Sequence, residues 1–121
     1  AWIDVAKRRD ADGIAPLLAD DVVFQSPAVF KPQAGKAITV KYLQAALAVL
    51  NNESFRYENM WFAERSAVLE FQVVIDGIHV NGVDIIFWNE RGLITEFRVM
   101  VRPLKGLNTV IPHMAARLQA E

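Results

Sequence analysis

The chain has 121 residues with 53% hydrophobic and 22% charged content, which excludes intrinsic disorder and predicts a single domain over residues 1–121. Its 13 basic and 14 acidic residues leave a net charge of −1, which argues against a nucleic-acid-binding surface and a membrane-surface role. The sequence has no cysteine and no apolar run of roughly 20 residues, so it predicts no disulfide, no thiolate nucleophile and no membrane span, and a cytoplasmic location fits.

The first half of the chain predicts helices around one short strand. The predicted elements are a helix at residues 2–6, a helical turn at 14–18, a strand at 22–24, an irregular segment at 28–35 and a helix at 36–50. The last of these has the clearest pattern, because Leu43, Leu47 and Leu50 recur at helical spacing with no proline or glycine inside the segment.

From residue 55 onward the hydrophobic period changes to two. The predicted strands cover residues 55–62, 67–75, 78–88 and 93–101, and a final helix follows Asn108 as its N-cap. Asp76-Gly77 indicates a two-residue hairpin, because both central residues of a type I′ turn have positive φ. Four hairpin-linked strands are long enough to curl, so the predicted fold is α+β: a cone-shaped half-barrel in which helices wrap a curved antiparallel sheet.

The side chains of such strands alternate between a concave and a convex face. The apolar set is expected on the concave face, and it comprises Leu69, Phe71, Val73, Phe97, Val99 and Val101. Glu70, Glu96 and Arg98 are expected on the convex face, where charge pairing across strands would contribute roughly a few tenths of a kcal/mol. Met100 and neighbouring apolar residues share that face, which predicts a homodimer through the convex sheet face.

Asp84 breaks this pattern. It shares one face of its strand with Val80, Gly82, Ile86 and Trp88, so its carboxyl group is expected inside the apolar core. An isolated carboxylate there loses hydration worth roughly several kcal/mol and must be paired, wetted or protonated. Two interpretations are open: a structural Asp hydrogen-bonded to a backbone amide or a tyrosine, or a functional acid in a pocket.

Two parts of the sequence resemble the nuclear transport factor 2-like superfamily, which has a cystatin-like fold. They are residues 17–27 (LLADDVVFQSP), and residues 82–87 (GVDIIF) followed by residues 92–97 (GLITEF). The resemblance covers nearly the whole chain and is strongest to SnoaL-like bacterial members, and more distant to ketosteroid isomerase. It implies the half-barrel fold, and only a class of activities, because this fold hosts isomerases, hydrolases, cyclases and non-catalytic binders.

The resemblance to ketosteroid isomerase can be carried over residue by residue. The general-base aspartate of that enzyme precedes the proline after the first strand, and Ser26 stands at this position here. The tyrosine of its first helix, which donates to the enolate, corresponds to a position near Trp2. Asp84 matches the second acid, which an apolar site keeps protonated as a hydrogen-bond donor. One of the three catalytic positions is therefore present, and steroid isomerisation by the known mechanism is not expected.

Epoxide hydrolases of this fold offer a second comparison, because they use an Asp-Arg-Asp set on adjacent strands. Here Val68 stands where the arginine would be wanted, and Glu70 is the nearby acid on the second strand. Glu96 and Arg98 are expected on the convex face, away from a pocket. The sequence therefore does not assemble this triad.

No metal site or cofactor is expected. The two histidines, His79 and His113, have no second ligand at metal-binding spacing, and no phosphate-binding or dinucleotide fingerprint occurs. Both histidines are expected in structural or surface positions.

The resemblance and the residue pattern together support two hypotheses. In the first, the chain binds a small apolar organic ligand, and Asp84 is a tentative catalytic acid in isomerisation, dehydration or cyclisation of a carbonyl compound. The expected ligand-binding residues are Ser26, Tyr42, Leu69, Phe71, Ile86, Phe97, Val99 and Val101. In the second, the chain is a non-catalytic dimerisation or ligand-sensing module whose pocket is the cavity that the fold leaves.

Overall fold

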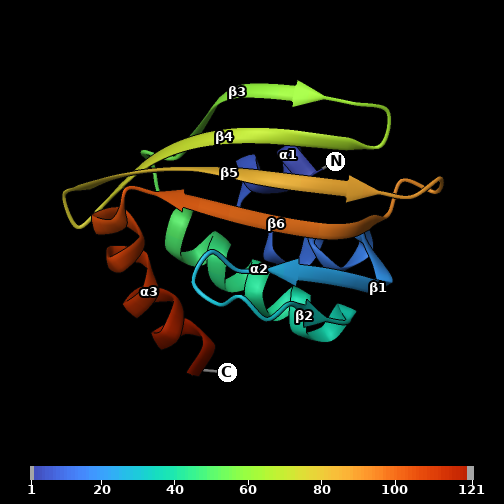
Figure 1. Ribbon diagram of the computed structural model, residues 1–121, viewed down its shortest axis with the longest axis horizontal. Helices are drawn as coiled ribbons and strands as arrows, with labels where there is room; N and C mark the ends of the chain where they lie inside the picture. The colour runs from blue at the N-terminus through green and yellow to red at the C-terminus, as the bar shows by residue number, and fades with distance from the viewer. Residues whose placement is uncertain (1, 120–121) are drawn as a thin grey trace.

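The computed structural model describes residues 2–119 (Figure 1). In this part of the chain three α-helices, two short 3-10 helices and one six-stranded sheet form the α+β fold that the sequence predicts. The helices are α1 (Trp2–Arg8), α2 (Lys36–Leu50) and α3 (Leu104–Gln119), with 3-10 turns at Ala11–Gly13 and Ala15–Leu17. The strands are β1 (Leu18–Gln25), β2 (Gln33–Ala34), β3 (Arg56–Phe62), β4 (Ser66–Ile75), β5 (Ile78–Trp88) and β6 (Ile94–Arg102).

The sheet has the strand order β2-β1-β6-β5-β4-β3. Strands β3 to β6 form the predicted antiparallel meander, and β1 then pairs with β6 in the parallel direction. The Asp76-Gly77 hairpin is confirmed, since the two residues have φ of 53° and 76° as a type I′ turn requires. The parallel β1–β6 pair lay outside the prediction, because pairing between strands far apart in sequence leaves no local signal.

Two segments differ from the sequence-based expectation near the first strand. Strand β1 begins at Leu18 rather than Val22, because the start of the strand pairs with Ile94 across an irregular stretch of the sheet. Residues 33–34 form β2 against Val23 and Phe24, inside the segment predicted to be irregular. Two paired residues are too few to show a period of two, so the sequence pattern could not reveal this strand.

The final helix also begins earlier than predicted. Helix α3 starts at Leu104, directly after Pro103, and the Leu107 amide donates to the Pro103 carbonyl at 3.0 Å. Asn108 is therefore a helical residue rather than the N-cap, and Pro112 lies inside the helix. The helix tolerates this proline at the cost of one backbone hydrogen bond, because α3 also packs against α2, β5 and β6.

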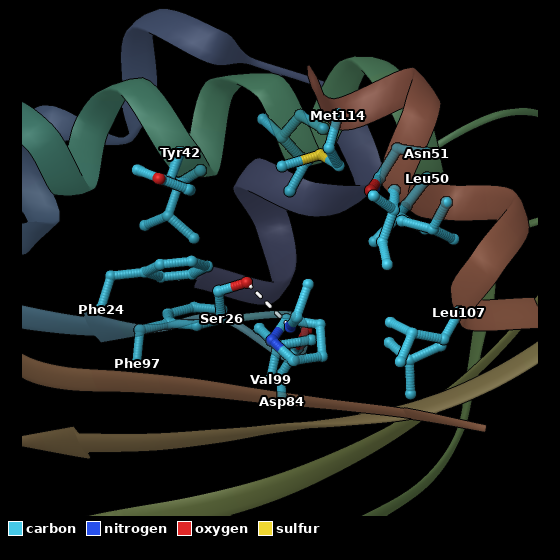
Figure 2. A pocket seen from close by; sticks show the side chains of 18 of the residues that line it. Phe24, Ser26, Tyr42, Leu50, Asn51, Asp84, Phe97, Val99, Leu107 and Met114 are labelled. Atoms are coloured by element: carbon cyan, nitrogen blue, oxygen red, sulfur yellow. Dashed lines mark hydrogen bonds between the residues drawn. The ribbon is translucent and has the colours of Figure 1, made fainter. Parts of the chain in front are cut away.

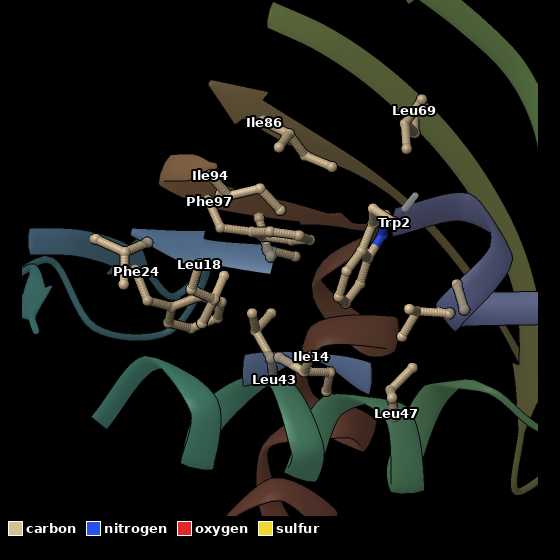
Figure 3. Close-up of a cluster of buried hydrophobic side chains, with 14 of the residues drawn as sticks. Trp2, Ile14, Leu18, Phe24, Leu43, Leu47, Leu69, Ile86, Ile94 and Phe97 are labelled. Carbon is tan, nitrogen blue, oxygen red and sulfur yellow. The ribbon is translucent and has the colours of Figure 1, made fainter. Parts of the chain in front are cut away.

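Helices α1, α2 and α3 lie on one side of the curved sheet (Figure 1), and the interior between sheet and helices divides into two clusters. The larger cluster gathers around Trp2, Leu43 and Phe97 (Figure 3). The smaller one gathers around Phe71 and Val110, near the start of α3. None of the helices at residues 2–119 is long and apolar enough to cross a membrane, and the cytoplasmic location stays a prediction.

Candidate functional site

A cavity of about 200 Å³ lies between the concave face of the sheet and helices α2 and α3 (Figure 2). Phe24, Phe97 and Val99 form much of its sheet wall, and aliphatic side chains of α2 and α3 form the opposite wall. The mouth lies between the loop at residues 26–29 and the C-terminal half of α3, where several of the lining residues are exposed. The walls are therefore mostly apolar, and the few polar groups on them decide what the cavity can recognise.

Asp84 supplies the acid of this cavity. It lies in the middle of β5, opposite Leu69 on β4 and Val99 on β6, and only 6% of its surface is exposed. The alternation of the strand places it on the concave face with Val80 and Ile86, as the sequence predicts. The sheet thus holds the carboxyl group on a rigid strand inside an apolar environment.

Tyr57 is the hydrogen-bond partner of Asp84. Its hydroxyl donates to Asp84 Oδ2 over 2.5 Å, and it accepts a hydrogen bond of 3.0 Å from Trp2 Nε1. Tyr57 belongs to β3 and faces inward because it pairs with Phe71, while Trp2 reaches it from α1. The resulting chain of donors runs from Trp2 through Tyr57 to Asp84 and joins three separate elements of the fold.

Burial raises the pKa of Asp84 from 3.8 to about 7, and the hydrogen bond from Tyr57 acts in the opposite direction with a smaller effect. Burial, the negative charge of Asp84 and donation to Asp84 raise the pKa of Tyr57 well above its ordinary value. Tyr57 therefore remains a neutral donor across the physiological range. Asp84 changes protonation near neutral pH, so both of its forms are available there.

Only one oxygen of Asp84 is open to a ligand. Tyr57 occupies Oδ2, and Oδ1 has no hydrogen bond to another described residue. Among residues 2–119, Arg98 Nε is the one side-chain polar atom that is both without a hydrogen-bond partner and fully enclosed by protein. Asp84 Oδ1 also has no partner, and it therefore keeps some accessible surface. Because Asp84 lines the cavity, a molecule inside it can reach Oδ1. A protonated Oδ1 donates a hydrogen bond, and an ionised one accepts a proton.

The structure brings most of the sequence-predicted site residues to this cavity. Those that line it with Asp84 are Ser26, Tyr42, Phe97, Val99 and Val101. Tyr42 stacks on Phe24 at a centroid distance of 5.3 Å, and Ser26 caps the loop by accepting from the Ala28 amide at 3.1 Å. That these residues bind a ligand stays a prediction.

Leu69, Phe71 and Ile86 lie elsewhere, which corrects their expected place in the cavity wall. Figure 3 shows Leu69 and Ile86 above the Trp2 side chain, and the two residues line a separate hollow that Trp2 also lines. Trp2 packs edge-on against Phe97, with centroids 4.8 Å apart, and so divides the concave face in two. Phe71 is fully buried under Phe55, whose ring stacks on it at 5.3 Å. The alternation predicted their face correctly, but helix packing decided what covers them.

Three polar residues of the cavity were not assigned to it from sequence: Trp2, Tyr57 and Asn51. For Tyr57 a signal existed, since period-two alternation along β3 puts it on the same face as Phe55. A bulge between Tyr57 and Asn59 ends that alternation and leaves the rest of β3 exposed. Trp2 and Asn51 reach the cavity only through the packing of α1 and of the C-terminal end of α2.

The remaining polar groups lie outside the cavity. His113 contacts the Asp76 carboxylate at 2.6 Å on the surface, and His79 is exposed. Arg98 pairs with Glu96 along its own strand, which corrects the expected charge pairing with Glu70 across strands. Glu70 instead accepts from two asparagine side chains, Asn59 at 2.9 Å and Asn81 at 3.1 Å. No cluster of metal-ligating side chains occurs within residues 2–119.

Comparison with known proteins identifies the family. The model of the SnoaL-like domain matches residues 1–97, which is most of the chain. The chain belongs to the SnoaL-like domain family. None of the proteins with curated functions matches the chain.

Two solved structures are similar to this SnoaL-like domain over almost its full length. A protein described as a steroid delta-isomerase from Pseudomonas aeruginosa is 36% identical, with a TM-score of 0.93, over 98% of this chain and 87% of that one. An uncharacterised protein with a cystatin-like fold from Silicibacter pomeroyi DSS-3 is 34% identical, with a TM-score of 0.86, over 94% of this chain and 79% of that one.

The epoxide hydrolase/cyclase-like enzyme SalBIII, described in pyran ring formation in the polyether salinomycin, shares the fold alone. It is 15% identical to this SnoaL-like domain, with a TM-score of 0.67, over 85% of this chain and 86% of the enzyme. The comparisons therefore establish a fold related to isomerases and cyclases. Because one fold can host many activities, the activity of this chain is inferred from the residues of its cavity.

Proposed function

We propose that this SnoaL-like domain binds a small, largely apolar carbonyl compound and promotes proton transfer at its carbonyl group through Asp84. The observation that carries the proposal is the free Oδ1 of a buried carboxyl group in an apolar cavity, beside a second oxygen that Tyr57 occupies. The likeness to a steroid delta-isomerase adds support at 36% identity.

The chemistry follows from the protonated form of Asp84. Its Oδ1–H donates to the carbonyl oxygen, which draws electron density to that oxygen and makes the adjacent C–H bonds more acidic. Tyr57 keeps the proton on Oδ1, because its own O–H already points at Oδ2. No second acid or histidine lines the cavity in the described part of the chain. Solvent at the mouth therefore receives the α-proton and returns a proton to a different carbon of the enolate, which completes the isomerisation.

The volume of the cavity suits a small substrate. An apolar cavity of ~150 Å³ takes up benzene. The present volume of about 200 Å³ therefore accommodates one ring or two small fused rings. A larger ligand would extend through the mouth between residues 26–29 and α3.

Isomerisation of 3-cyclohexen-1-one to its conjugated isomer tests this proposal, and the ultraviolet absorbance of the product measures it. The wild-type protein should accelerate the reaction, and the rate should fall as pH rises through about 7, because the Asp84 donor is lost. Asp84→Asn should reduce the rate by roughly 100-fold or more. The matched control is Glu70→Gln, which changes an acid on the opposite face of the sheet. Equal rates for wild type and Asp84→Asn would refute the catalytic role.

The convex sheet face supports a second proposal, a homodimer, which a non-catalytic module would also form. Trp61 and Met100 are 56% and 50% exposed on this face. Val68, Val83 and Ile85 lie between them in adjacent strands, so the apolar surface is continuous across β3 to β6. Light scattering after size exclusion should give twice the chain mass, and Met100→Glu should halve it. A monomer at micromolar concentration would contradict the dimer.

A further inference from the structure

Asn51 is a second polar group in the wall of the cavity. It follows the last residue of α2 and is 91% buried, with 9% of its surface exposed. Its backbone N–H donates to the Leu47 carbonyl at 3.1 Å, which holds the residue at the end of the helix. Figure 2 shows Asn51 on the helical wall and Asp84 on the sheet wall. The two residues therefore approach the cavity from opposite sides.

Only half of the Asn51 carboxamide is satisfied. Its Nδ2 donates to the Ala6 carbonyl at 2.9 Å, and this bond fixes which end of the amide is the donor. Its Oδ1 accepts no hydrogen bond from the described residues. Unlike Arg98 Nε, it is not fully enclosed by protein and keeps some accessible surface. Because this oxygen has no protein partner and remains accessible, a ligand donor that reaches it adds a hydrogen bond and with it affinity.

We infer that Asn51 Oδ1 is a hydrogen-bond subsite for a hydroxyl or N–H group of the ligand. The inference rests on the proposed function, because it concerns the end of the bound ligand opposite the carbonyl group that Asp84 contacts. Asp84 Oδ1–H binds the carbonyl oxygen, and Asn51 Oδ1 accepts from a donor at the opposite end. The substrate class is therefore a hydroxy- or amino-substituted ketone with one or two rings and an apolar body.

The tests use three compounds, 6-hydroxy-1-tetralone, 6-methoxy-1-tetralone and unsubstituted 1-tetralone. Each has a ketone on a two-ring body, and only the first has a donor at the far end. Isothermal calorimetry on the wild-type protein should show about tenfold tighter binding of the hydroxy compound, which is the effect of one buried hydrogen bond. The 5- and 7-hydroxy isomers vary the spacing between the two polar ends.

Variants locate the effect. Asn51→Leu should remove the preference, so that the hydroxy compound binds this variant no more tightly than 1-tetralone does. The matched control is Asn52→Leu, because Asn52 also donates its Nδ2 to a backbone carbonyl, that of Val74 at 2.8 Å, but does not line the cavity. This control should keep the preference.

The outcomes separate the inference from the proposed function. Equal wild-type affinity for all hydroxy and non-hydroxy tetralones would overturn the Asn51 subsite and leave carbonyl binding standing. A preference that persists in Asn51→Leu would also overturn it. Failure of every tetralone to bind would overturn both. Because the comparison of compounds needs only the wild-type protein, the inference remains testable even where Asn51→Leu does not fold.

Discussion

The two faces of the sheet place similar acids in opposite environments. Asp84 pairs with Leu69 across β4 and β5, and the next pair in the same ladder joins Glu70 to Val83. Burial raises the pKa of Asp84 to about 7, whereas hydrogen bonds from Asn59 and Asn81 lower that of Glu70. One step along the ladder therefore separates an acid whose pKa is raised from an acid whose pKa is lowered. What differs is the side of the pleat and what covers it.

The largest expected effect comes from neutralising the buried acid with Asp84→Asn. Between pH 3.8 and about 7 the unfolded chain loses the Asp84 proton while the folded chain keeps it, so wild-type stability falls as pH rises through this window. The fall amounts to at most about 4 kcal/mol, at 1.36 kcal/mol for each unit of pKa. The Asn variant lacks this loss and should be the more stable protein at pH 8 and similar to wild type below pH 4.

Urea unfolding of both proteins from pH 3.5 to 8 measures this effect. The control is Glu70→Gln under the same conditions. Parallel pH profiles for wild type and Asp84→Asn would contradict a buried carboxyl group with a raised pKa.

The next effect concerns the concave face itself. Gly82 lies directly opposite Phe71, and a Cβ at Gly82 would overlap the Phe71 ring and come within 2.6 Å of the Met100 carbonyl oxygen. Gly82→Ala should therefore destabilise the fold by about 1–3 kcal/mol. Chemical denaturation measures the loss. In a double-mutant cycle Phe71→Leu should recover part of it, and strict additivity would show that the ring is not what the new methyl meets.

A smaller effect is expected from Tyr57→Phe, which removes the donor to Asp84 Oδ2. The hydrogen bond from Tyr57 lowers the pKa of Asp84, so its loss should raise that pKa above about 7. Stability should fall by about 1–2 kcal/mol, since Trp2 Nε1 also loses its acceptor. Carboxyl-carbon NMR across pH 4 to 9 follows Asp84, with Tyr42→Phe as the control. An unchanged or lowered pKa would contradict the assigned role of Tyr57.

The smallest effect should come from the exposed acid. Glu70→Gln exchanges the carboxylate that accepts from Asn59 and Asn81 for an amide that can still accept once. The melting temperature at pH 7 should change by less than about 2 °C, because surface interactions of this kind contribute little. Calorimetry provides the measurement. A shift as large as that of Asp84→Asn would remove the contrast between the two faces.

The sequence alone determined the parts of this protein that depend on local spacing. Helix α2 and strand β5 have the bounds that their hydrophobic periods predict, and the Asp76-Gly77 turn has the predicted positive φ values. The period of two also placed Asp84 on the apolar face, because alternation in a strand is fixed by its geometry. The family motifs implied the fold by resemblance to known proteins.

Only the tertiary structure decided what surrounds that acid. Trp2 and Tyr57 meet 55 positions apart in the chain, and Asn51 reaches the cavity from the end of α2. Leu69 and Ile86 share the face of Asp84 yet line a separate hollow, so the same alternation places residues of one face in two different cavities. Such contacts depend on how helices pack over the sheet, and side-chain packing between distant segments leaves no periodic signal in the sequence.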